Sequence, residues 1–145
     1  MPLPAPTPAH VAVAADSAIV REINSVRASR GLPRLIPTAS LERAATRHTA
    51  DMLSHDRISH SASNGTRFNT RMRRILPFRA FGETIAWAEN EQASPSAIVR
   101  LWLASPPHRL ELLSRAFRRI GVGIGSRQVG GQRIVAITAD FATQR

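Results

Sequence analysis

Two apolar runs near the C-terminal end of the chain place the strongest constraint on the fold: RRIGVGIGSRQ at 118–128 and QRIVAITADF at 132–141. The pair Gly130-Gly131 lies between them, where a tight turn favours glycine. The two runs therefore predict antiparallel strands joined by a hairpin. Because helical periodicity dominates the preceding residues, the fold class predicted is α+β, with helices packed on a small antiparallel sheet.

The helices are predicted from apolar residues that recur every three or four positions. The first three helices are expected at about 17–30, 39–54 and 64–75. A fourth runs from Pro95 to the break at Pro106-Pro107, and one or two further helical turns follow that break. His48 lies on the apolar stripe of the second helix and is interpreted as a core-edge histidine with a satisfied hydrogen bond. The fourth helix is capped by Ser94, and its expected buried stripe consists of Ala97, Ile98, Leu101 and Trp102.

The length of 145 residues predicts one domain, which we place at 16–145. Residues 1–15 are expected to be a disordered or linker tail, because four prolines occur among the first eight residues. This start lacks the basic region of a signal peptide and is interpreted as a linker or the cut end of a longer precursor. No run of about 18 apolar residues predicts a membrane span.

The charge of the chain is strongly positive and comes from arginine alone. All 20 basic residues are arginine, against 10 acids, for a formal net charge of +10. Such an excess favours anionic partners, namely nucleic acid, anionic lipid or acidic wall polymer. Specific nucleic-acid binding is not expected, because the arginines are dispersed and do not alternate with aromatic residues. The absence of cysteine excludes disulfides, Cys-rich zinc sites and thiol nucleophiles.

Seven segments, taken in order, resemble the CAP superfamily of cysteine-rich secretory, antigen 5 and pathogenesis-related proteins, in its bacterial SCP-like extracellular form. They extend over nearly all of residues 17–142 and read INSVRASRGLPRL, LERAATRHTADM, SH, FGET, WLASPPHR, RIGVGIG and ITADF. The resemblance implies a three-layer α-β-α sandwich. It also implies a secreted protein with an extracellular or periplasmic location.

The resemblance also implies a cleft. His60 and His108 match the two histidines of the family's central cleft, and Glu83 matches the acid of its Gly-Glu-Asn element, which is Gly82-Glu83-Thr84 here. In many members a second glutamate lies where this chain has Ser105. The ligand-binding cleft is therefore expected to comprise His60, Glu83, His108 and Ser105.

A metal ion is one candidate occupant of this cleft. Two imidazoles and a carboxylate suit Zn²⁺ or Cu²⁺, and the same side chains could hold water or a ligand hydroxyl instead. The spacing of His60, Glu83 and His108 matches no local metal motif. His55 is either a further ligand or a solvated loop residue. Ser105 is interpreted as an N-cap rather than a nucleophile, because no Gly-x-Ser-x-Gly elbow surrounds it.

Three functions remain open. The first is a binding module whose cleft holds a lipid, a cell-wall fragment or a divalent metal without turnover. The second is a protease-like hydrolase in which Glu83 acts as general base, alone or with a metal. The third is a domain that binds a protein partner while the cleft is vestigial. The resemblance favours the first, because CAP domains are largely regarded as non-enzymatic scaffolds. Asp51 and Asp140 are either buried acids or solvated and capping residues.

Overall fold

The computed structural model describes residues 8–75 and 78–144. Along the chain the elements are α1 (Pro8–Ser29), β1 (Ile36–Pro37), α2 (Ala39–Ser54), α3 (Phe68–Arg73), β2 (Phe81–Glu89), a 3₁₀ turn (Asn90–Ala93), α4 (Pro95–Ala104), α5 (Pro106–Leu113), β3 (Phe117–Val129) and β4 (Gln132–Thr143). No helix among the described residues is both long and apolar enough to cross a bilayer.

The sheet has four strands in the order β1-β3-β4-β2. The predicted hairpin is confirmed as β3 and β4, which pair antiparallel, with Gly130 at φ 62° in the turn. β2 pairs antiparallel with the other side of β4 and forms an edge of the sheet, whereas the short β1 runs parallel to β3. The central strand β4 is buried on both faces from Ile134 to Ala142.

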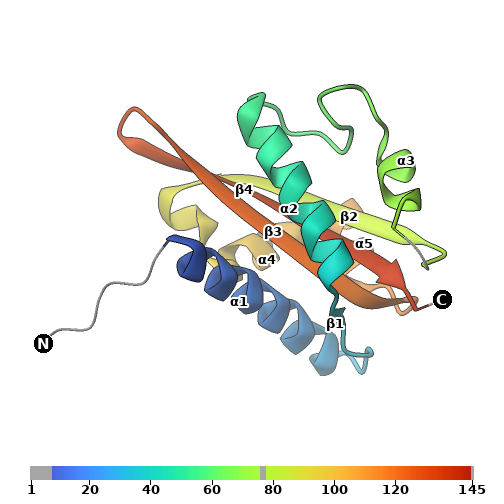
Figure 1. The fold of residues 1–145 in the computed structure, drawn as a ribbon. Coiled ribbons are helices and arrows are strands. Elements are labelled where there is room, and N and C mark those ends of the chain that lie inside the picture. The colour runs from blue at the N-terminus through green and yellow to red at the C-terminus, as the bar shows by residue number, and fades with distance from the viewer. Residues whose placement is uncertain (1–7, 76–77, 145) are drawn as a thin grey trace, which may run out of the picture.

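Both faces of β4 are buried because helices cover both sides of the sheet. α2 lies across one face, whereas α1 and α4 lie on the other (Figure 1). The α-β-α sandwich that the resemblance implied is therefore confirmed. The larger core cluster fills the α1 and α4 side and includes Ile19, Ile23, Ile98, Trp102, Ile120 and Phe141.

α2 approaches the sheet very closely, and glycines in β3 make this approach possible. A Cβ added at Gly121 would overlap the backbone of Leu41 and Glu42, and one at Gly123 would overlap Ala45 and Thr46. Glycine is therefore required at both positions by the space left under the helix. The RIGVGIG segment thus has a packing reason for its glycines.

On the opposite face, buried polar side chains join the helices to the strands. Trp102 donates from Nε1 to the carbonyl oxygen of Ile85 at 3.0 Å and so ties α4 to β2. Arg27 of α1 is fully buried. Its guanidinium donates to four carbonyl oxygens, those of Pro33, Leu112, Ser114 and Phe117.

Three helix predictions differ from the structure. The third helix spans Phe68–Arg73 rather than 64–75. The first helix begins at Pro8 rather than at 17, so residues 8–15 of the expected tail are helical, and the rest of that tail lies outside the described residues. The division of the chain at residue 16 stays a prediction. Leu101 was expected in the buried stripe of α4 but is 53% exposed, because the buried face turns toward Val99 and is formed by Ile98, Val99 and Trp102.

Candidate functional site

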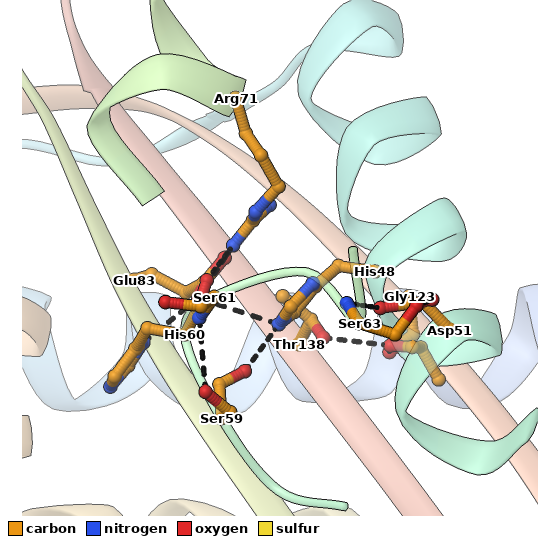
Figure 2. A network of polar contacts seen from close by, with 11 residues as sticks. His48, Asp51, Ser59, His60, Ser61, Ser63, Arg71, Glu83, Gly123 and Thr138 are labelled. Atoms are coloured by element: carbon orange, nitrogen blue, oxygen red, sulfur yellow. Dashed lines mark hydrogen bonds and ion pairs between the residues drawn. The ribbon is translucent and has the colours of Figure 1, made fainter. Parts of the chain in front are cut away.

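Glu83 is at the centre of a buried polar network. It lies on the edge strand β2, and its side chain is only 1% exposed. Its Oε1 accepts a hydrogen bond from His60 Nδ1 at 2.8 Å. Arg71 of α3 donates through Nη2 to both carboxylate oxygens, at 3.0 and 2.9 Å. Figure 2 shows Arg71 and His60 approaching Glu83 from different sides.

Arg71 also holds the loop that carries His60. Its Nη2 donates to the His60 carbonyl oxygen at 2.7 Å, so one guanidinium nitrogen fixes both the loop backbone and the acid. A second anchor lies farther along this loop, where Asp51 of α2 accepts hydrogen bonds from Ser63 N at 2.7 Å and Ser63 Oγ at 2.5 Å. The loop is therefore attached to both α2 and α3.

Asp140 is the neighbour of Glu83 on the central strand. The two residues are paired across β2 and β4, and Asp140 is fully buried. Burial raises the pKa of Asp140 well above its ordinary value, and the nearby charge of Glu83 raises it further. Burial also opposes ionisation of Glu83, but His60, Asp140 and Arg71 together lower the pKa of Glu83. Asp140 is therefore the member of the pair that holds the proton.

His48 closes the network on the α2 side. It is buried, and its Nε2 lies 2.6 Å from the Ser59 carbonyl oxygen and 3.9 Å from Glu83 Oε1. A carbonyl only accepts, so Nε2 carries the proton. Burial lowers the pKa of His48, which favours the neutral ring. The predicted core-edge position is confirmed, but the hydrogen bond satisfies only one ring nitrogen, because Nδ1 has no partner among the described residues.

The four residues of the expected cleft do not all share this network. His60 and Glu83 are in direct contact, whereas His108 lies on the first turn of α5 and its side chain makes no hydrogen bond or ion pair with any described residue. Burial and the positive field of His60 both lower the pKa of His108, so the two imidazoles interact electrostatically. The convergence of His108 with the other two stays a prediction. Ser105 caps α5 by position, but its side chain makes no capping hydrogen bond.

A hollow of about 620 Å³ lies beside the network, and none of His60, Glu83 and His108 lines it. Its walls come from α5 and the start of β3 and consist of Pro106, Arg109, Leu110, Glu111, Leu113, Ser114 and Phe117. Glu111 connects the hollow to the network, because it packs so closely over Gly82 that a Cβ there would overlap its carboxylate. Burial raises the pKa of Glu111, although the positive field of His60 opposes this.

The surroundings of Glu83 are a poor fit for the metal ion considered as an occupant of the expected cleft. The Glu83 carboxylate is already bound by a guanidinium, whose charge would repel a cation placed beside it. Among the side chains that the structure describes, no three of His, Cys, Asp or Glu are grouped so as to hold a metal. His55, the other candidate ligand, is exposed and contacts Asp51 instead.

Arg71, Asp140 and Glu111 belong to the site although sequence reasoning did not assign them to it. Asp140 had a usable signal, because an acid inside the apolar run ITADF must be buried if the run is a central strand. Glu111 had a weaker signal: it lies three residues after His108 on a predicted helix, and residues at this spacing share one helix face. Arg71 had none, since RMRR offers three arginines without a way to choose among them.

Comparisons with known proteins agree with the fold. The Bacillus subtilis (strain 168) protein YkwD is 29% identical over 109 residues, which is 74% of this chain and 41% of YkwD. An extracellular protein containing a SCP domain from Bacillus anthracis superposes with a TM-score of 0.78 at 25% identity, over 98% of this chain and 45% of that one. The chain therefore spans less than half the length of either relative.

A third comparison covers nearly the whole of the matched protein. An outer surface protein from Borrelia burgdorferi superposes with a TM-score of 0.75 at 22% identity, over 89% of this chain and 92% of that one. The family model described as the cysteine-rich secretory protein family, CAP, matches residues 20–141. This match runs from the last ten residues of α1 to Phe141 in β4, so the chain belongs to the CAP family of cysteine-rich secretory proteins, although it contains no cysteine.

Proposed function

We propose that this chain is a secreted CAP domain that binds a ligand at the cleft of His60, Glu83 and His108 without turnover. The observation that carries the proposal is the state of Glu83, whose two carboxylate oxygens are both bound by Arg71 and whose side chain is buried. An extracellular or periplasmic location is part of the proposal. It is supported by the extracellular and outer-surface proteins among the solved relatives.

The state of Glu83 disfavours the hydrolase. A general base needs a free lone pair and a pKa near the working pH. Glu83 instead has a lowered pKa and hydrogen-bond donors at both oxygens, so it positions His60 rather than accepting a proton from water. The His60 side chain is half exposed and offers the rest of its imidazole to a ligand.

The surroundings of the cleft favour an amphipathic, anionic ligand, for which we take a lipid as the class. Leu110 is 74% exposed at the rim of the hollow beside the cleft, and Leu113 and Phe117 extend its apolar wall. Arg109 lines the same hollow and adds a positive charge. A hydrocarbon chain in the hollow would bring an acidic head near His60 and Arg109. The arginine excess would hold such a protein near an anionic lipid or wall polymer.

Binding can be tested with dodecanoate below its micellar concentration, titrated by calorimetry. We expect His60→Ala and His108→Ala to weaken binding by about tenfold, since each removes one hydrogen bond to a charged head. His55→Ala is the matched control, because His55 is an exposed histidine outside the network. Equal affinities in all three variants would remove the cleft from the proposal.

Turnover is tested separately with casein, peptidoglycan and ester substrates. We expect no activity. Hydrolysis that Glu83→Gln abolishes would replace the binding module with a hydrolase. Zn²⁺ and Cu²⁺ are titrated in the same way. Metal binding that is lost in both His60→Ala and His108→Ala would contradict the poor fit of a metal ion beside Glu83.

A further inference from the structure

A second cavity is lined by Arg71 and His48 but not by Glu83. It measures about 350 Å³ and is lined by residues of α2, the end of α3 and the loop around Asn64. Arg71 and His48 each turn one nitrogen toward Glu83 and also line this cavity. The cavity does not include His60, His108 or the hollow beside α5, so it is separate from the cleft.

The cavity is positively charged. Arg47 of α2, Arg71 of α3 and Arg74 at the end of α3 line it, together with one carboxylate, that of Asp51. Both oxygens of Asp51 already accept hydrogen bonds from Ser63, so this carboxylate is occupied and does not neutralise the arginines by direct contact. Arg47 and Arg74 are exposed and take part in none of the ion pairs formed by the described residues.

Arg71 offers a fixed donor to this cavity. All its hydrogen bonds to described residues are made by Nη2. Its Nη1 makes none with a described residue, and 14% of the Arg71 side chain is exposed. Since Glu83 holds the guanidinium in place, Nη1 loses little conformational freedom when it binds an acceptor. Thr66 adds a hydroxyl to the same wall.

We propose that this cavity binds the phosphate group of a small phosphate monoester. Arginine forks match the oxygens of phosphate, and guanidiniums from two helices can surround a tetrahedral anion better than they can a planar carboxylate. The small volume, about 350 Å³, favours a soluble phosphate ester over the headgroup of a membrane lipid. The proposal does not depend on the cleft or on its ligand.

The test compares two double variants of equal charge. Arg47→Gln with Arg74→Gln removes the two exposed arginines of the cavity. Arg43→Gln with Arg73→Gln removes exposed arginines of the same two segments that do not line it. The probe is glycerol 3-phosphate, with inorganic phosphate and acetate as further probes, titrated by calorimetry.

We expect the cavity variant to bind glycerol 3-phosphate at least about tenfold more weakly than the wild type, and the control variant to stay within about twofold. Inorganic phosphate should follow the same pattern, and acetate should bind more weakly than either. Equal weakening in the two variants would overturn the proposal, because only net charge would then matter. So would the absence of binding to the wild type, or acetate binding as tightly as phosphate.

Vesicles that contain phosphatidic acid separate a soluble ester from a lipid headgroup. We expect both double variants to bind such vesicles equally less than the wild type, through general charge attraction. A loss confined to the cavity variant would overturn the assignment to a soluble ester.

Discussion

Asp140 of β4 lies directly opposite Glu83 of β2, and both side chains are shut off from solvent. Two adjacent carboxyl groups in such a place cannot both carry a charge. Burial and the charge of Glu83 keep Asp140 protonated, whereas Arg71 and His60 keep Glu83 ionised. The pair therefore carries one negative charge, and that charge orients the His60 ring.

Replacement of the neutral acid tests this assignment. An aspartate with a raised pKa keeps its proton in the folded protein at pH values where the unfolded chain has lost it. The free energy of unfolding therefore falls as the pH rises above the unfolded value of about 3.9. Asp140→Asn is neutral at every pH and so lacks this penalty. We expect its stability relative to the wild type to increase between about pH 4 and neutrality, measured by urea denaturation. Parallel pH profiles would show that Asp140 is ionised.

Arg71 is expected to be the most sensitive polar residue of the network. Arg71→Gln leaves the buried Glu83 carboxylate without its countercharge and should lower the free energy of unfolding by about 3 kcal/mol. Arg73→Gln, on the same helix but exposed, should change it by less than about 0.5 kcal/mol. If Arg71→Gln and Glu83→Gln act through one ion pair, the double variant should cost less than the sum of the two single changes. Additive costs would contradict the pairing.

The close approach of α2 to β3 gives a packing prediction. Gly121→Ala would drive a Cβ into the backbone of α2, which cannot turn aside as a side chain can. We expect a loss of about 3 kcal/mol in the free energy of unfolding, measured by guanidinium denaturation. Gly131→Ala is the control, because an added Cβ there meets nothing within 4 Å. Similar stabilities of the two variants would show that α2 can move away from the sheet.

Arg27 gives a prediction about the opposite layer. Arg27→Met fills similar space but leaves four carbonyl acceptors without their donor, and we expect a cost of about 3 kcal/mol in thermal and chemical unfolding. Arg21→Met replaces an exposed arginine of the same helix and should be nearly neutral. Arg27→Lys retains the charge but not the fork, so it should recover only part of the loss.

Local patterns in the sequence predicted the elements well, but they could not supply the contacts between distant elements. The span of α2 and the position of His48 on its buried face followed from periodicity, and the hairpin followed from its paired glycines. The opposition of Glu83 and Asp140 depends on the register between strands that lie far apart along the chain, and no local pattern encodes that register. The contact of His60 with Glu83 came from family resemblance, since 23 residues separate the two.

Errors at the helices also have physical causes. Leu101 lies at a helical spacing from the buried residues of α4, so periodicity alone places it on their face. Its exposure is decided by where α1 packs against α4, which the local pattern does not show. The early start of α1 was missed because prolines at the beginning of the chain favour a tail, although proline is tolerated in a first helical turn.

The close packing of α2 on the glycines of β3 means that the two helical layers of the sandwich differ in how well they tolerate substitutions. On the α1 side, large side chains fill the space between helix and sheet, so a changed volume at one position can be offset by its neighbours. On the α2 side, backbone rests on backbone at Gly121 and Gly123, and at these two positions no side chain lies between helix and strand to adjust. Substitutions should therefore accumulate over generations in the α1 layer, whereas α2, which positions His48 and Asp51, should keep its distance from the sheet almost unchanged.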